Sequence, residues 1–285
     1  MTVVVTGATG HLGHLIVEAL LRDGVAASDI VAGGRNLEKL DDLADRGVRV
    51  ETIDYNDPAT LSTALAGADT LVLVSASEPG HRVEQHRAAI DAAVAVGVKH
   101  IVYTSAPKAR TSQLILAPEH KATEELIEAS GVTATILRNG WYTENYAQAA
   151  RQASESGVLV ASVGDGLVAS ASRKDYADAA AAVVTQPGLA GKVYELSGDV
   201  AWSFSDLAAT ISAITGKHVV YTPVDTAQHA AILKSAGLDD GTIGFVTALD
   251  SNIRDGVLSE TSGDLAKLIG HPTTPLAEGL ADALK

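Results

Sequence analysis

The chain has 285 residues, no cysteine and a formal net charge of −14. This acidic balance argues against nucleic acid and anionic membrane as partners, because their phosphates require a basic surface. Without cysteine the chain has no disulfide, thiolate metal site or cysteine nucleophile. No apolar run is long enough to span a bilayer and no basic leader precedes the first strand, so we expect a cytoplasmic protein.

The N-terminus has the pattern of a strand, a glycine turn and a helix. Val3–Val5 predicts a short buried strand, Gly7, Gly10 and Gly13 follow it, and an apolar-periodic helix begins near His11. Glycines at such a turn let the backbone approach a pyrophosphate, whose charge is stabilised by the free N–H groups of the helix. The spacing differs from the simple Gly-x-Gly-x-x-Gly fingerprint. Its position between strand and helix nevertheless predicts a dinucleotide cradle.

Strands and helices then alternate through residue 138, as βαβ units do. The predicted strands are Asp29–Arg35, Val48–Ile53, Asp69–Ser77, Val98–Ser105 and Val132–Leu137. The predicted helices lie near Leu37–Arg46, Pro58–Ala66, His81–Val96 and Glu119–Ser130. Residues 1–138 are therefore expected to form an α/β dinucleotide-binding domain with a Rossmann-type, doubly wound parallel sheet.

In residues 139–285 the alternation of strands and helices becomes less regular. Asn139–Tyr146 is predicted to open a helical stretch, and strands are predicted at Gly157–Val163, Lys192–Leu196 and Val219–Thr222. Further helices are predicted at Lys174–Thr185, Ser203–Ile214, Ala227–Ala236, Gly241–Ile253, Gly263–Ile269 and Leu276–Leu284. We interpret this half mainly as a smaller α/β lobe on the substrate side, with some elements returning to the Rossmann sheet.

The end of the second strand indicates which nicotinamide cofactor binds. An acidic residue about 20 positions after the glycine turn favours NAD, whereas an arginine accommodates the 2′-phosphate of NADP. Arg35 occupies that window without a carboxylate, and Lys39 follows as a possible second positive group. NADPH is expected, with NADH binding more weakly. Asp54, after the third strand, either accepts a hydrogen bond from the adenine or caps the Pro58 helix, a role that Asp57 would serve equally well.

Hydroxyl residues close the fourth and fifth strands, at Ser75, Ser77, Thr104 and Ser105, where a ligand crosses an open α/β sheet. None of the seven tyrosines has a lysine four residues later, so the Tyr-x-x-x-Lys pair of ordinary short-chain dehydrogenases is missing. A reaction without a strong protein acid fits better: hydride passes to an electron-poor acceptor.

His120 and Lys121 open the helix that follows the fifth strand and are predicted to face the substrate region. Either would donate a proton or a hydrogen bond there, or else lie on the surface. The pairs His11/His14 and His81/His86 lack a third ligand or His-Glu-x-x-His spacing, so no metal is expected.

Several segments resemble the NmrA-like group of atypical short-chain dehydrogenases, and in particular its quinone- and dye-reducing members. They are Thr6–Gly13, Arg35–Asn36, Leu137–Tyr142 with Glu144–Tyr146, Lys192–Asp199 and Leu268–Thr274, and they span essentially the whole chain. The glycine motif is common to many families, whereas Arg138-Asn-Gly-Trp-Tyr142 and the C-terminal segment are more specific.

The resemblance implies a Rossmann lobe that binds NADPH and a small C-terminal lobe that forms a substrate cleft. It implies a 2′-phosphate contact from Arg35. It also implies that the pyrophosphate is bound by the residues of the glycine turn: Gly7, Thr9, Gly10, His11, Leu12 and Gly13. Around the nicotinamide it implies Ser75, Ala76, Ser77, Thr104, Asn139, Gly140, Trp141 and Tyr142. In related reductases a lysine begins the helix at the position of His120, which puts a lysine-based mechanism in doubt here.

Trp141 and Tyr142 either stack on a flat acceptor ring or seal the interface between the lobes. Tyr142 is, with His120, the candidate for substrate positioning or proton donation. The expected function is an NADPH-dependent reductase of a quinone or similar planar acceptor, including triphenylmethane dyes, without flavin or metal. The alternative is an NADP(H)-binding redox sensor without catalysis. A homo-oligomer is compatible with either function.

Overall fold

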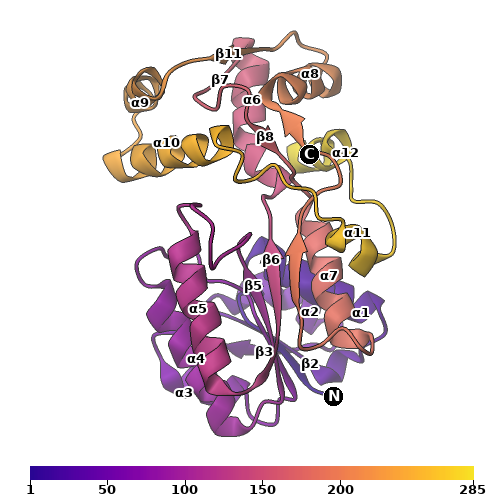
Figure 1. Cartoon of the computed structure of the whole chain (residues 1–285). Helices are drawn as coiled ribbons and strands as arrows, with labels where there is room; N and C mark the ends of the chain where they lie inside the picture. The colour runs from indigo at the N-terminus through magenta and orange to yellow at the C-terminus, as the bar shows by residue number, and fades with distance from the viewer.

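The computed structural model describes residues 1–285 and contains one large parallel sheet (Figure 1). Its seven strands lie in the order β3-β2-β1-β4-β5-β6-β9, and every neighbouring pair is parallel. The strands are β1 (Val3–Val5), β2 (Ile30–Gly34), β3 (Arg49–Thr52), β4 (Thr70–Leu73), β5 (His100–Ser105), β6 (Thr133–Asn139) and β9 (Val193–Leu196). The predicted Rossmann-type fold is confirmed.

Helices cover both faces of this sheet, because its central strands are apolar on both sides. Val3 and Val5 pack into one core cluster and Val4 into the other, as strand alternation requires. One face carries α1 (His11–Arg22), α2 (Asp41–Ala44), α7 (Arg173–Thr185) and α11 (Asp264–Ile269). The other face carries α3 (Pro58–Ala64), α4 (Arg82–Val96) and α5 (Ala117–Ser130). None of the helices in the chain has the length and apolar character needed to cross a bilayer.

The chain leaves the sheet after β6 and builds a smaller lobe above its carboxyl edge (Figure 1). Two small sheets lie there, β7 with β11 and β8 with β10, around an apolar core that includes Tyr146, Trp202 and Phe204. The strands are β7 (Val158–Ala161), β8 (Leu167–Val168), β10 (Trp202–Ser203) and β11 (Val220–Pro223). The helices are α6 (Ala147–Ser156), α8 (Phe204–Thr215), α9 (Thr226–Ser235), α10 (Asp240–Arg254) and α12 (Leu276–Leu284).

The predicted helix Leu37–Arg46 is a 3₁₀ turn, η2 (Leu37–Leu40), followed by the single turn of α2. Leu40 and Leu43 are fully buried and Leu37 packs against the same cluster. Leucines spaced by three residues fall on one side of a helix with three residues per turn, which explains the tighter winding. The predicted helix is therefore confirmed for residues 37–44, with its first turn wound as a 3₁₀ helix.

Two other boundaries differ from prediction. Strand β4 ends at Leu73 rather than Ser77, because the N–H groups of Val74 and Ser75 donate to the hydroxyls of Thr6 and Thr104 (3.0 and 2.9 Å) and not to a neighbouring backbone. The stretch 139–142 is extended rather than helical, and helical winding starts only at η3 (Thr143–Tyr146). Gly140 N–H donates to the Leu196 carbonyl at the end of β9, which keeps this stretch alongside the sheet.

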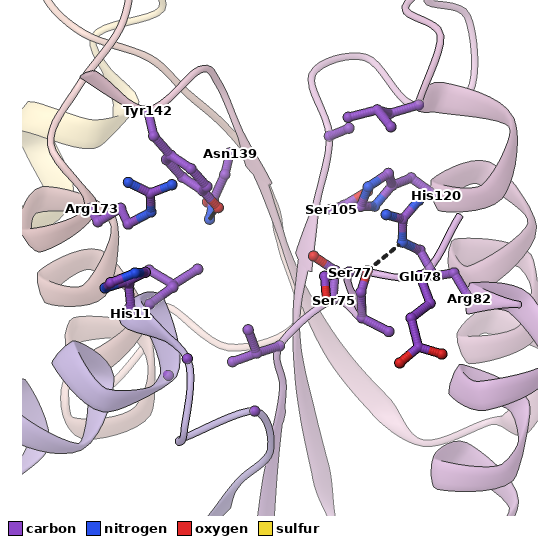
Figure 2. Close-up of a pocket in the computed structure, with 18 of the residues that line it drawn as sticks. His11, Ser75, Ser77, Glu78, Arg82, Ser105, His120, Asn139, Tyr142 and Arg173 are labelled. Atoms are coloured by element: carbon purple, nitrogen blue, oxygen red, sulfur yellow. Dashed lines mark hydrogen bonds between the residues drawn. The ribbon is translucent and has the colours of Figure 1, made fainter. Parts of the chain in front are cut away.

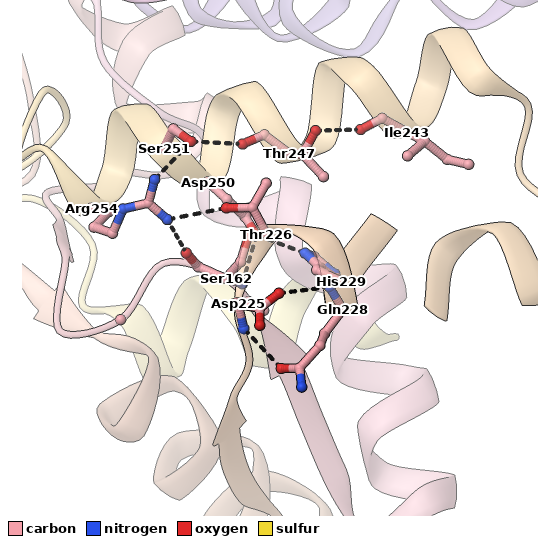
Figure 3. A network of polar contacts seen from close by, with 12 residues as sticks. Ser162, Asp225, Thr226, Gln228, His229, Ile243, Thr247, Asp250, Ser251 and Arg254 are labelled. Carbon is pink, nitrogen blue, oxygen red and sulfur yellow. Dashed lines mark hydrogen bonds and ion pairs between the residues drawn. The ribbon is translucent and has the colours of Figure 1, made fainter. Parts of the chain in front are cut away.

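A buried polar network attaches α9 to the rest of the small lobe (Figure 3). The Asp250 carboxylate on α10 accepts hydrogen bonds from the backbone N–H and the hydroxyl of Ser162, both at 2.7 Å. His229 Nδ1 on α9 lies 2.8 Å from the same oxygen. His229 is the one buried residue of α9, so this network replaces apolar packing as the main attachment of that helix.

We expect Asp250→Asn to lower the free energy of unfolding by about 2 kcal/mol, because hydrogen bonds to a charged acceptor contribute more than neutral ones. Urea unfolding followed by tryptophan fluorescence measures this change. Asp240→Asn on the same helix is the control: its exposed carboxylate pairs only with Lys234, so a change below about 0.5 kcal/mol is expected. Equal losses in the two variants would contradict a stabilising role for the network.

Candidate functional site

The glycine turn is held by a direct contact between Gly7 and the first turn of α1. A Cβ on Gly13 would lie 2.4 Å from the Gly7 carbonyl oxygen, so only glycine lets the helix approach this closely. Gly7 has a φ of +62°, which turns the chain after β1, and the Gly10 N–H donates back to its carbonyl. Gly10 is the N-cap of α1 and provides no capping side chain. The free N–H groups of the helix start therefore remain available to an anion.

A cavity of about 550 Å³ opens above this turn, between the large sheet and the small lobe. Figure 2 shows His11, Asn139, Tyr142 and Arg173 on one wall, opposite Ser75, Ser105 and His120 on the other. Most of the predicted site residues line this single cavity: Gly7, Thr9, Gly10, His11, Leu12, Gly13, Arg35, Asp54, Ser75, Ala76, Ser77, Ser105, His120, Asn139, Gly140, Trp141 and Tyr142.

Thr104 was also predicted at the site but does not line the cavity. It is buried, and its hydroxyl accepts a hydrogen bond from the Ser75 N–H at 2.9 Å. Side chains alternate along a strand, so Ser105 rather than Thr104 reaches the cavity at the end of β5. The structure therefore gives Thr104 a supporting role beneath the Ser75–Ser77 loop.

Two side chains from α4 fix that loop. The Ala76 N–H donates to His86 Nε2 at 2.9 Å, and Arg82 Nε donates to the Ala76 carbonyl at 2.8 Å. His86 Nδ1 lies 2.9 Å from the Thr123 hydroxyl, which itself donates to the Glu119 carbonyl. His86 therefore carries its proton on Nδ1 and leaves Nε2 free to accept. In the sequence, His86 was considered only as a metal ligand together with His81, and that pair was judged not to form a metal site.

The Arg35 end of the cavity contains a charge pair that was not predicted. Arg35 is exposed and its guanidinium lies 3.0 Å from Glu78, which also accepts from Gln85. The hydrogen bond from Gln85 comes first, and the charge of Arg35 contributes, in lowering the pKa of Glu78. Lys39 is exposed and does not line the cavity.

Asp54 and Asp57 have separate roles. Asp57 caps α3 by accepting from the Ala59 N–H at 3.0 Å. Asp54 lines the cavity and accepts from the backbone and side-chain N–H groups of Asn56. Of the two alternatives for Asp54, the helix cap is excluded, and its free oxygen remains near the cavity.

His120 lines the cavity but is only 5% exposed. Its Nδ1 lies 2.8 Å from the hydroxyl of Tyr103, a fully buried residue of β5. Lys121 does not line the cavity; its exposed amine lies 3.9 Å from Glu125. Of the two adjacent candidates, the structure brings only His120 to the site.

The segment Asn139–Tyr142 forms the opposite wall. A Cβ on Gly140 would lie 2.8 Å from the Leu196 carbonyl, so this position requires glycine. Tyr142 packs edge-on against Tyr176, and the Arg173 guanidinium sits 4.7 Å from its ring centre. Burial raises the pKa of Tyr142, which disfavours loss of its proton. Trp141 both lines the cavity and packs against the small-lobe core.

Two buried acceptors in the cavity wall have no hydrogen-bond partner in the protein, Asn139 Oδ1 and Gln85 Oε1. Buried polar atoms are rarely left unpaired, so both fit a ligand that brings N–H or O–H donors. Together with the open start of α1, they match the carboxamide, hydroxyl and phosphate groups of a nicotinamide dinucleotide.

Sequence reasoning missed several residues that line the cavity: Gly34, Ile53, Tyr55, Val74, Glu78, Arg82, Gln85, Ala106, Pro107, Leu114, Leu116, Asn145 and Arg173. Arg173 begins α7 far along the chain, and no local motif connects it with Tyr142. Leu114 and Leu116 have no distinguishing pattern either.

Outside the cavity, His14, Glu18 and Asp42 place ligand atoms within 4.8 Å of one another. Glu18 also pairs with Arg46, which neutralises part of the negative charge that a cation would need. This cluster of surface groups has no other feature of a metal site, and we assign it no function.

Known proteins resemble this chain in both sequence and fold. A model of the NmrA-like family matches residues 1–243. Quinone oxidoreductase 2 of Escherichia coli is 49% identical over 279 residues, which cover 98% of this chain and 97% of that protein. The structure of an NADPH-dependent quinone oxidoreductase from E. coli in complex with NADPH superposes with a TM-score of 0.95 at 48% identity, over 100% of both chains. Citrobacter sp. triphenylmethane reductase complexed with NADP(H) superposes with a TM-score of 0.94 at 40% identity, over 99% of this chain and 100% of that one.

The two buried histidines beside the cavity predict a loss of stability in acid. Burial first, then the charge of Arg82, lowers the pKa of His120 from 6.5 to about 3. Burial, then His120 and Arg82, lowers that of His86 equally to about 3. Below about pH 6.5 the unfolded chain therefore binds protons that the folded chain excludes until near pH 3. Each histidine should remove about 1.4 kcal/mol of stability per pH unit across this window.

Urea unfolding at a series of pH values between about 7.5 and 5 measures this slope. Replacing His86 and His120 by Gln in turn should flatten it, whatever the stability of each variant at neutral pH. His218→Gln, at an exposed position, serves as the control and should keep the wild-type slope. Unchanged slopes in both site variants would show that the two histidines do not exclude protons in the folded state.

Proposed function

This chain belongs to the NmrA-like family, and on that premise we propose that it is an NADPH-dependent reductase of quinones or similar planar, electron-poor acceptors. The observation that carries the proposal is one continuous cavity lined by two chemically different sets of residues. One set is the glycine turn with Arg35, and the other is His120, Trp141 and the apolar Leu114 and Leu116. The relatives described as quinone oxidoreductase and triphenylmethane reductase support this assignment.

The residues present fit NADPH along the length of the cavity. The open N-terminus of α1, with Gly7, Thr9, Gly10, His11, Leu12 and Gly13 around it, would hold the pyrophosphate. Arg35 would bind the 2′-phosphate and Asp54 would accept from the adenine amino group. Ser75, Ala76, Ser77 and the Asn139–Tyr142 segment would surround the nicotinamide, with Asn139 Oδ1 accepting from its carboxamide. Thr104 would act only through Ser75.

When bound, NADPH supplies the hydride, and the protein supplies position and environment. Trp141 and the leucines form an apolar wall suited to a flat ring. Tyr142 is held by Asn139, Arg173 and Tyr176, and its raised pKa favours a positioning role over proton donation. The absence of a Tyr-x-x-x-Lys pair agrees with an acceptor whose reduced form takes its proton from water.

A turnover assay tests this function against a redox sensor that binds NADP(H) without chemistry. We expect steady loss of NADPH absorbance with benzoquinone, and with a triphenylmethane dye, well above the rate without protein. A protein that binds NADPH but gives no turnover with either acceptor would favour the sensor.

We expect Arg35→Ala to raise the KM for NADPH about 10-fold, because a charge-assisted contact with the 2′-phosphate is lost. The KM for NADH should change less than about 2-fold, since NADH has no such phosphate. Initial-rate kinetics with both cofactors measure the two values.

Lys39→Ala is the matched control, since Lys39 follows Arg35 closely but lies outside the cavity. It should leave both KM values unchanged. If Arg35→Ala weakened NADPH and NADH alike, Arg35 would not be the residue that distinguishes the two cofactors.

A further inference from the structure

The hydroxyl of Tyr103 lies 2.8 Å from His120 Nδ1, and the Thr123 hydroxyl is its other polar neighbour. Tyr103 is fully buried, so its O–H has no access to water. A buried hydroxyl proton without an acceptor is strongly disfavoured. The Thr123 hydroxyl already donates to the Glu119 carbonyl and accepts from His86 Nδ1, so His120 Nδ1 is the better-placed acceptor. Tyr103 therefore donates to His120 Nδ1.

That direction of donation determines the protonation of His120. A neutral imidazole has one N–H, and with Nδ1 accepting from Tyr103 the proton sits on Nε2. Nε2 makes no hydrogen bond within the protein, and it is not among the buried polar atoms that lack a partner. Because His120 lines the cavity, its Nε2–H is presented to whatever ligand occupies that end (Figure 2).

Burial, followed by the charge of Arg82, keeps the ring neutral, and the Glu124 carboxylate opposes them with the smallest effect. Arg82 and His86 face it from α4, Tyr103 from β5 and Glu124 from its own helix. Arg82 forms an ion pair with Glu119 and also donates to the Ala76 carbonyl, so its charge stays close to His120. Burial and this positive charge together disfavour a second proton on the imidazole.

We propose that Tyr103 is a positioning residue that holds His120 as a neutral Nε2–H donor to an oxygen of the quinone-like acceptor. The proposal rests on the reductase function above. In the reaction the hydride brings both electrons to the quinone, NADPH becomes NADP⁺, and negative charge develops on a quinone oxygen. His120 stabilises that charge by a hydrogen bond and keeps its proton, while water supplies the one proton that completes the hydroquinone.

Proton release by His120 is disfavoured for a structural reason. Loss of the Nε2 proton, with transfer of the Tyr103 proton to Nδ1, would leave a phenolate inside the sheet. Burial raises the pKa of Tyr103, and no cation bonds its oxygen. The pair formed by Tyr103 and His120 is therefore arranged to donate a hydrogen bond and not to act as an acid.

Tyr103→Phe tests the proposal, because it removes the hydroxyl and keeps the buried ring. We expect kcat with benzoquinone to fall roughly 3- to 10-fold, with the KM for NADPH unchanged. Tyr146→Phe is the matched control: its buried hydroxyl has no partner and lies outside the cavity, so kcat should stay at the wild-type value. A wild-type kcat in Tyr103→Phe would overturn the proposal.

Nitrogen NMR of the full chain labelled with ¹⁵N-histidine gives a readout that does not depend on turnover. In the wild type, His120 should show a protonated Nε2 and an accepting Nδ1 at all pH values from about 6 to 8. In Tyr103→Phe the Nδ1 signal should move, because its donor is gone. A proton on Nδ1 in the wild type, or a second proton gained within this pH range, would contradict the assignment.

A second pair of variants covers the case in which Tyr103→Phe does not fold. His120→Gln retains an N–H donor and His120→Leu does not, so the Gln variant should keep the higher kcat; equal values would overturn the donor role. If the wild type reduced no quinone at all, the proposed function would fail, while the NMR spectra would still decide the Tyr103–His120 arrangement separately.

Discussion

The contact between Gly7 and Gly13 is the constraint on which the cavity around the glycine turn depends. Because neither residue has a side chain, the start of α1 packs directly on the turn after β1, and its N–H groups face the cavity. The same turn places Thr9 against Gly34, where a Cβ would lie 2.4 Å from the threonine methyl, so the first two strand ends are held together. The position of Arg35 beside the glycine turn follows from that packing.

The cavity wall around Ala76 and His120 is organised by buried polar groups of α4, α5 and β5. His86 and Arg82 hold the backbone of Ala76 from below, and Tyr103 orients His120 from within the sheet. Glu124, also buried, is bonded by Arg138 and Ser105, which lower its pKa although burial alone would raise it. This wall therefore rests in large part on side chains that do not line the cavity, such as His86, Tyr103 and Glu124. Such an arrangement keeps the donors aligned before a substrate arrives, which is the main requirement for electrostatic stabilisation.

The remaining walls of the cavity are held by contacts between residues that are distant in the sequence. Tyr142 is held by Arg173 and Tyr176 from α7, and Ile115 in the loop above β5 donates to Asn252 on α10. The same Asn252 donates to the Gln113 carbonyl, so one side chain joins the cavity loop to the small lobe. The polar attachment of α9 through Asp250 shows that this lobe uses hydrogen bonding where its apolar core is thin.

The sequence alone determined the succession of strand, glycine turn and helix at the N-terminus, the doubly wound fold and most residues of the cavity. Each of these rests on a local signal in the sequence. The glycine spacing, the arginine after the second strand and the apolar central strands are readable within a few residues. Only the tertiary structure decided that Ser105 and not Thr104 reaches the cavity, since the pleat of β5 and the early end of β4 set which side chain faces it. The tertiary structure also brought together Arg35 with Glu78, Tyr103 with His120, and Tyr142 with Arg173. These pairs form across separate elements, so their chemistry depends on packing distances that no local pattern encodes.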